Sequence, residues 1–204
     1  KKDIINEYLS VVKDAEFNGQ IVDVNSFALE NIYEINYEIE PEKNVALVNI
    51  GASTMNMNIL KGGISVFTRD SAVGSNLHTE VLQREFNLTY EMAERLKRGE
   101  PVENVSPQDA FSVMELASEE IIGEVNRSLE YFHEDIHEIV LSGGCALIKD
   151  FPNLLAEKIR VETKLMQPFK NIKIAKHFDL SFIEEMAPMA VVAAGLALRR
   201  PGDR

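Results

Sequence analysis

The sequence predicts an α/β protein in which helices cover a mixed sheet. Three apolar runs separated by turn residues occupy positions 44–67, as in an antiparallel meander. A fourth run, Ile139–Leu141, is continuous and ends in Ser142-Gly143-Gly144, which is typical of a strand buried on both faces. Segments with helical spacing follow the meander and flank the fourth strand. This order of elements indicates a mixed α/β sheet with helices packed on it.

Composition and charge limit the class of protein. The 204 residues, 45% of them hydrophobic, suffice for one large domain or two small ones. A net charge of −12 with scattered lysines and arginines argues against nucleic-acid binding. The longest apolar run, residues 187–198, is shorter than a membrane span of roughly 20 residues. A single cysteine and no signal-peptide core favour a reducing cytoplasm.

The first 42 residues are expected to form helix, strand and helix. Apolar residues recur at intervals of three and four from Ile4 to Val12 and again from Ser26 to Tyr33, so both segments are expected to be helices. Ile21–Val24 is expected to be a short strand between them. Residues 40–43 are charged and contain a proline, which is typical of a linker. A domain boundary near residue 42 is therefore expected.

Helices are expected after the three strands. Gly74–Phe86 and Leu88–Arg98 both have helical spacing. A long helix is expected to start at Ser106-Pro107, with serine as N-cap and proline at the first helical position, and to reach Phe132. Beyond the fourth strand we expect a helix at 152–159, a strand at 163–166 and a small-residue helix at 186–199.

Two glycine-containing turns are candidate ligand contacts. The turn Gly51-Ala52-Ser53-Thr54 combines a glycine with two hydroxyls, and consecutive amides in such a turn can bind an anion such as phosphate. The alternative is a compact hairpin turn with no ligand. Gly143-Gly144 follows a buried strand, where α/β sheets bind ligands and a flat ring could lie against bare backbone. The alternative is a strand-to-helix turn that requires positive φ.

A charged helical pair is the third candidate. Glu94 and Lys97 are three residues apart and therefore lie on one helix face. Such a pair could bracket a ribose, or it could be an ordinary intrahelical ion pair. His133 and His137 do not combine with Cys145 into a metal-ligand spacing, and Cys145 is expected to be a packed small residue. No catalytic residue and no metal ligand are assigned.

Four motifs in order carry a family resemblance. They are Asn49-Ile50-Gly51-Ala52-Ser53-Thr54, Ala93-Glu94-x-x-Lys97, Ser142-Gly143-Gly144-Cys145-Ala146 and the small-residue run from Pro188 to Ala197. Together they resemble the actin-like ATPase superfamily. Within it the chain looks most like the PilM family of type IV pilus assembly proteins, which are relatives of the division protein FtsA.

The resemblance implies a fold and a domain organisation. It implies an actin-like, ribonuclease H-like domain: a mixed sheet flanked by helices, with a smaller inserted subdomain. Residues 1–42 would be the tail of the first domain, and residues 43–204 the second domain, subdomain 2A, with a 2B-like insertion at about 89–132. The first phosphate loop of the family has no counterpart, so the 204 residues correspond to the second half of the family protein.

The resemblance also implies site residues and a cofactor, ATP or ADP with Mg²⁺. The residues carried over by it are Asn49, Gly51, Ala52, Ser53 and Thr54 in the second phosphate loop, Gly74 near the cleft, Glu94 and Lys97 at the ribose and base, and Gly143 and Gly144 in the adenosine motif. Family members commonly have aspartate where Asn49 stands. Because asparagine is neutral, it would position a metal and an attacking water less well.

The function implied is that of a cytoplasmic scaffold gated by ATP, with weak or no ATPase activity. Its partners would be the cytoplasmic tail of a PilN-like inner-membrane protein and other platform and motor proteins of the pilus, which would keep it peripheral to the membrane. An active ATPase of the same complex is the main alternative. An FtsA-like division protein would end in an amphipathic membrane helix, which residues 200–204 do not resemble, and a sugar kinase would need a catalytic aspartate.

Overall fold

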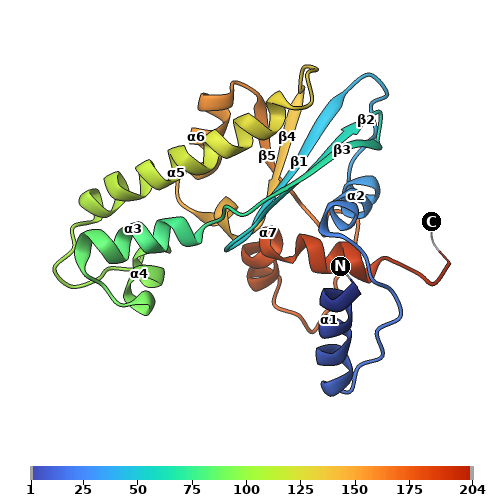
Figure 1. Ribbon diagram of the computed structural model, residues 1–204, viewed down its shortest axis with the longest axis horizontal. Coiled ribbons are helices and arrows are strands. Elements are labelled where there is room, and N and C mark those ends of the chain that lie inside the picture. The colour runs from blue at the N-terminus through green and yellow to red at the C-terminus, as the bar shows by residue number, and fades with distance from the viewer. Residues whose placement is uncertain (1, 203–204) are drawn as a thin grey trace.

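Five strands form one sheet in the order β3-β2-β1-β4-β5, which confirms the mixed α/β class (Figure 1). The computed structural model describes residues 2–202; residues 1, 203 and 204, at the ends of the two expected domain ranges, lie outside the described residues. β1–β2 and β2–β3 pair antiparallel, whereas β1–β4 and β4–β5 pair parallel. The strands are β1 Asn44–Ile50, β2 Met55–Lys61, β3 Ile64–Ser71, β4 Glu138–Ser142 and β5 Glu162–Leu165.

The central strand β1 is buried on both faces because helices cover both sides of the sheet. Its alternate residues Ala46, Val48 and Ile50 belong to a core that includes α5 Pro107–Glu130 and α6 Phe151–Ile159. Val45 and Leu47 belong to the core on the other face. Successive side chains of a strand point to opposite faces of the sheet. A strand with apolar residues on both faces is therefore buried only when helices cover both sides, which gives three layers.

The opposite face is covered by α2 Asn25–Asn36 and α7 Leu180–Ala197, which lie below the sheet in Figure 1. The two helices are packed closely, because a Cβ at Gly195 would collide with the backbone of Ala28. α2 thus shares a core with the sheet, although it precedes the expected boundary near residue 42. That boundary stays a prediction.

The helix α7 begins earlier than the sequence predicted. Its N-cap is Asp179, whose side chain accepts from the amide of Ser181, rather than a residue near Met186. Pro188 lies inside the helix. The expected start at Met186 is therefore wrong, because α7 tolerates an interior proline and extends back to Leu180.

The helices α3 Asn76–Phe86 and α4 Tyr90–Lys97 confirm two expected helices and pack on the first half of α5. As Figure 1 shows, these three helices project together from one end of the sheet. Their own small core includes Leu82, Ala93 and Met114. α5 begins as expected, with the Ser106 hydroxyl accepting from the Asp109 amide at 3.1 Å. The assignment of this region to an inserted subdomain stays a prediction.

The N-terminal segment differs from the expectation in one element. α1 Lys2–Asp14 forms as predicted but buries none of its residues. The strand expected at Ile21–Val24 is absent, and Val22 and Val24 are 59% and 54% exposed. A single extended segment becomes a strand only when another strand provides hydrogen bonds, and no described strand runs beside it.

Among residues 2–202, α7 is the one helix long and apolar enough, by length and composition, to cross a membrane. Length and composition alone are weak evidence, because core helices of folded domains pass the same test. The packing of Gly195 against Ala28, and of Val191 in the core beneath the sheet, gives α7 a role inside the fold.

Candidate functional site

The turn Gly51–Thr54 presents free backbone amides at the end of β1. It is closed by the Gly51 amide, which donates to the Thr54 carbonyl at 2.9 Å. The Gly51 and Ala52 carbonyls accept from the Ser75 and Asn76 amides at 2.9 and 2.8 Å, so they face the start of α3. In the hydrogen bonds described for residues 2–202, the amides of positions 52–54 donate to no protein group. These amides, in an exposed turn, can bind an anion.

Gly74 fixes this turn against α3. A Cβ at Gly74 would lie 2.5 Å from the Ala52 carbonyl oxygen and 2.7 Å from that of Gly51. A side chain would therefore push the turn away from the helix. The structure brings Gly74 and the turn together and gives Gly74 a packing role, while its place near a nucleotide stays a prediction.

The two glycines after β4 differ in what surrounds them. Gly143 has φ +88, and a Cβ there would collide with the Ile50 carbonyl. Its amide donates to the Pro188 carbonyl of α7 at 2.8 Å. Gly144 begins the short 3₁₀ helix η1 Gly144–Leu147, and the nearest atom to a Cβ there would be the sulfur of Met189 at 3.7 Å. Gly143 is thus needed for packing, while Gly144 leaves bare backbone at the surface.

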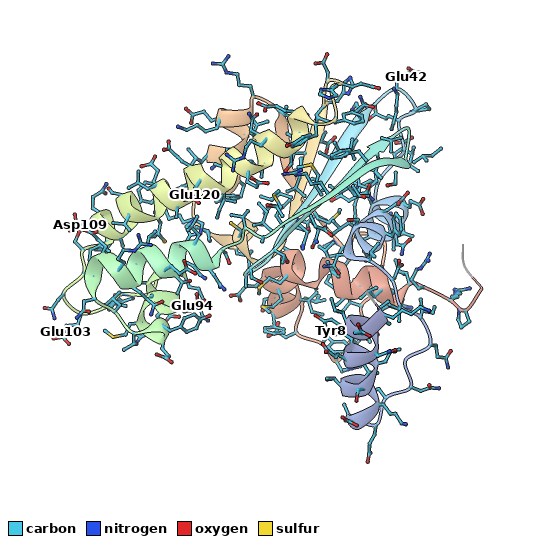
Figure 2. All side chains as sticks on the ribbon, in the orientation of Figure 1. Tyr8, Glu42, Glu94, Glu103, Asp109 and Glu120 are labelled. Carbon is cyan, nitrogen blue, oxygen red and sulfur yellow. The ribbon has the colours of Figure 1, made fainter. Side chains whose placement is uncertain are left out.

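Glu94 and Lys97 form a closed cluster with Thr79 of α3 (Figure 2 labels Glu94). The Thr79 hydroxyl donates to Glu94, and the Lys97 ammonium donates to Thr79 at 2.9 Å and to Glu94 at 2.5 Å. Burial acts to raise the pKa of Glu94, but the hydrogen bonds from Lys97 and Thr79 outweigh it and lower that pKa. The pair therefore holds opposite charges in fixed positions. Thr79 belongs to none of the four sequence motifs.

Lys97 also influences two buried groups nearby. Burial, together with the nearby Lys97 charge, lowers the pKa of His78 to about 4. Its ring lies 2.9 Å from the Ser118 hydroxyl. Burial raises the pKa of the Cys145 thiol, and Lys97 acts in the opposite direction. Cys145 is fully buried, as expected of a packed residue.

A hollow of about 540 Å³ lies beside Lys97, and we call it the α4–α5 hollow. Arg98, which directly follows α4, and Leu147 of η1 also line it, together with Phe111 and Met114 of α5. Its size falls in the range of roughly 300–1,000 Å³ that is common for small-molecule sites. Sequence reasoning did not identify Arg98 or Leu147, because neither belongs to a motif.

Asn49 takes part in a buried polar network beneath the sheet. Its amide nitrogen donates to the Asn56 side-chain oxygen at 3.4 Å, and its amide oxygen accepts from the Ser142 hydroxyl at 3.1 Å. The Asn56 oxygen also accepts from Asn25 of α2 at 3.0 Å, and the Asn56 amide nitrogen donates to Asp70 at 2.7 Å. Asn49 is 9% exposed, and the network uses both ends of its amide group.

Among the described residues 2–202, no group of three or more histidine, cysteine, aspartate or glutamate side chains is arranged to bind a metal. His137 instead accepts from the Asn44 amide through its Nδ1 at 3.1 Å. Asn44 begins β1, so this histidine lies at the opposite end of the strand from the Gly51–Thr54 turn.

The family model for type IV pilus assembly protein PilM matches residues 1–201. The chain belongs to the PilM family. Among solved structures, it is similar to the PilM–PilN type IV pilus biogenesis complex, with 25% identity and a TM-score of 0.83. That match covers 96% of this chain but 57% of the PilM-complex chain. The chain thus spans little more than half of that relative.

Two further solved structures share the fold. MreB5 of Spiroplasma citri bound to AMPPNP matches at 18% identity and a TM-score of 0.64, over 95% of this chain and 63% of that chain. The ethanolamine utilization protein EutJ from Carboxydothermus hydrogenoformans matches at 18% identity and a TM-score of 0.61, over 85% of this chain and 53% of that chain. Together with the PilM match, they confirm the actin-like fold expected from the sequence motifs.

Proposed function

We propose that this chain is the nucleotide-binding part of a scaffold in the type IV pilus assembly platform. ATP or ADP would lie with its phosphates on the free amides of the Gly51–Thr54 turn. Its ribose would lie at Glu94 and Lys97, and its base would enter the α4–α5 hollow beside Leu147. The supporting observations are that the Gly51–Thr54 and Gly143–Gly144 turns meet at one end of the sheet, and that the hollow beside Lys97 is lined by Leu147, three residues beyond Gly144.

The residues present fit a nucleotide in chemical terms. Free backbone amides and an ammonium suit phosphate oxygens, and the Glu94 carboxylate is an acceptor for ribose hydroxyls. The hollow is lined by apolar side chains and also by charged ones, Arg98, Lys149 and Asp150 among them. The planar guanidinium of Arg98 can stack on an aromatic base. Magnesium, if present, would be held mostly by the phosphates and water, since metal sites of this kind use few protein ligands.

We favour a nucleotide-gated scaffold over an ATPase that turns over. Asn49 occupies the position where a carboxylate would help to place a metal and a water, and its amide is already used by Asn56 and Ser142. Nucleotide binding would then shift the protein between conformations without a chemical step. The hydrolysing alternative predicts steady phosphate release.

The longer family protein would contribute a first domain. The apolar side chains of Ile4, Tyr8 and Val11 on α1 are 50%, 72% and 67% exposed, and Phe182 and Met189 of α7 are 59% and 44% exposed. Exposed apolar surface of this extent is typical of a face that packs against another domain. We propose that the first domain covers it, and that a PilN-like tail docks largely on that domain.

Nucleotide binding can be tested directly with a fluorescent ATP analogue and the 204-residue chain. Gly144→Val is the informative variant, because its Cβ has room in the fold yet would occupy the bare backbone surface. We expect this variant, and Lys97→Met, to weaken binding at least about tenfold. Arg95→Met on the same helix is the control, since Arg95 is half exposed and pairs with Glu100. Saturable binding that is unchanged by Gly144→Val and by Lys97→Met would refute the proposed site.

Turnover is a separate measurement. Phosphate release should be followed with a version that carries the remaining length of the family protein, because half of the nucleotide cleft is expected there. We expect negligible release from the natural sequence. Steady release by the natural sequence would refute the scaffold interpretation and support an ATPase, without contradicting nucleotide binding.

A further inference from the structure

A second hollow of about 260 Å³ lies between α5 and α6, and we call it the α5–α6 hollow. Its floor consists of core side chains: Met114, Ile148 and Phe151 are 8%, 6% and 1% exposed. The half-buried side chains of Phe111 and Leu154 form apolar walls. Figure 1 shows why space remains, since α5 runs on past α6 toward the α3–α4 end of the molecule.

This hollow adjoins the α4–α5 hollow but is a different space. Four residues, Phe111, Met114, Lys149 and Asp150, line both hollows and form the boundary between them. Lys97 and Leu147 line the α4–α5 hollow but not the α5–α6 hollow. Its volume is also below the roughly 300 Å³ at which small-molecule sites usually begin, so it is better sized for one large side chain than for a cofactor.

The rim of the hollow is acidic. Glu115, Asp150 and Glu157 line it and are exposed, against a single lysine, Lys149. Lys158, one residue beyond Glu157, is already engaged by Glu119 at 2.6 Å. The unpaired charge around the opening is therefore negative, and it adds to the field of a chain with a net charge of −12. Complementary charge steers and selects protein partners.

We propose that the α5–α6 hollow is a docking site for a partner protein that inserts one aromatic side chain flanked by lysine or arginine. The apolar floor would bury the ring, and the carboxylates of Glu115, Asp150 and Glu157 would pair with the flanking cations. Aromatic residues and arginine dominate binding at protein interfaces because one end of each is apolar and the other polar or charged. A basic, aromatic segment matches both properties of the hollow.

The test uses two five-residue peptides with the natural 204-residue chain: acetyl-Lys-Lys-Trp-Lys-Lys-amide and acetyl-Glu-Glu-Trp-Glu-Glu-amide. The chain contains no tryptophan, so the indole fluorescence of the peptide reports its own burial. We expect the lysine peptide to bind with a blue shift in its emission. We expect the glutamate peptide to bind at least about tenfold more weakly.

Three variants separate docking in the hollow from general attraction to an acidic chain. Leu154→Phe fills the hollow without adding tryptophan and should abolish the blue shift. The double variant Glu115→Gln, Glu157→Gln should weaken binding of the lysine peptide about fivefold at low salt. Glu120→Gln removes a charge from the outer face of α5, where Figure 2 labels it, and should leave binding unchanged.

Two kinds of result would overturn the proposal. The first is equal binding of the two peptides, or a blue shift that survives Leu154→Phe. The second is concentration-dependent self-association that excludes the peptide and is lost in Leu154→Phe, because the occupant would then be a second copy of the chain. No nucleotide is added, so the outcome does not depend on the function proposed above.

Discussion

Replacing Asn49 with aspartate, the residue that family members commonly have, should destabilise this chain. The amide nitrogen of Asn49 donates to the Asn56 oxygen, which already accepts from Asn25. An aspartate would place a second acceptor against that oxygen. Asn56 cannot turn its amide around, because its nitrogen donates to Asp70 at 2.7 Å. The new carboxylate would also repel the carboxylate of Asp70 within the same network.

The expected cost can be worked out from these contacts. Losing the bond from Asn49 to Asn56 costs about 1 kcal/mol, and leaving two facing acceptors without a donor costs about 1–3 kcal/mol more. The free energy of unfolding at pH 7 should therefore fall by about 2–4 kcal/mol in Asn49→Asp. The measurement is urea unfolding followed by far-UV circular dichroism, with the slope checked against the natural chain.

The same variant should show a characteristic pH dependence. A protonated carboxyl at position 49 could donate to Asn56, so folding raises its pKa above the unfolded value of about 3.9. A raised carboxyl pKa destabilises the fold above the unfolded pKa and has no effect below it. Each pH unit above 3.9 adds at most about 1.36 kcal/mol to the cost of holding a charged carboxylate at position 49. This part of the cost is therefore at most about 1.5 kcal/mol at pH 5.

The matched control is Asn153→Asp, the same chemical change in the exposed first turn of α6. An added negative charge there should be neutral or slightly stabilising. Equal free energies of unfolding for Asn49→Asp and the natural chain, at both pH 7 and pH 5, would show that the described orientation of the Asn49 amide is wrong.

Three further outcomes are expected. Gly143→Ala should lower the free energy of unfolding by about 3 kcal/mol or more, because its Cβ would collide with the Ile50 carbonyl at positive φ; thermal unfolding measures this. The free energy of unfolding should fall by about 3 kcal/mol between pH 6.5 and pH 4, because His78 binds a proton more readily in the unfolded chain than in the fold. Urea unfolding across this pH range measures the loss. The Cys145 thiol should react with a disulfide reagent at pH 8 at least about 100-fold more slowly in the native protein than in the denatured protein.

Each of these outcomes has a control and a contrary result. Gly99→Ala shares the positive φ but has open space around its Cβ, so it should cost only about 1–2 kcal/mol; equal costs would contradict the packing role of Gly143. His78→Gln should remove this loss of stability between pH 6.5 and pH 4. If the loss persisted in the variant, a group other than His78 would cause it. Rapid native labelling of Cys145 would contradict its burial.

The sequence predicts those parts of the fold that depend on local pattern. The run Ile139–Leu141 has no polar position, and the structure buries it on both faces in β4. Ser106 and Pro107 mark the start of α5 through local capping chemistry. The segment Ile21–Val24 is also mostly apolar, with Asp23 as its one polar position, but no described strand lies beside it. Strand formation depends on a partner, and the local sequence does not reveal whether one is present.

The candidate site shows the same division. The glycines at 51, 74 and 143 could be selected from the sequence, because turns and close packing require that residue type. Their meeting at one end of the sheet depends on the parallel pairing of β1 with β4, which no local pattern specifies. Thr79 and Arg98 have no motif at all, and they join the site only because α3 and α4 fold back onto each other.

The helix α7 is fixed at two points that are seven residues apart. At Pro188 its carbonyl is bonded to the Gly143 amide, and at Gly195 it touches the backbone of Ala28. These points are about 10 Å apart along the helix axis. A tilt of α2 at one point would therefore rotate α7 as a stiff rod and displace the glycine turn at the other. Mechanical strain applied at the α2 end would thus reach the turn after β4 through a single helix.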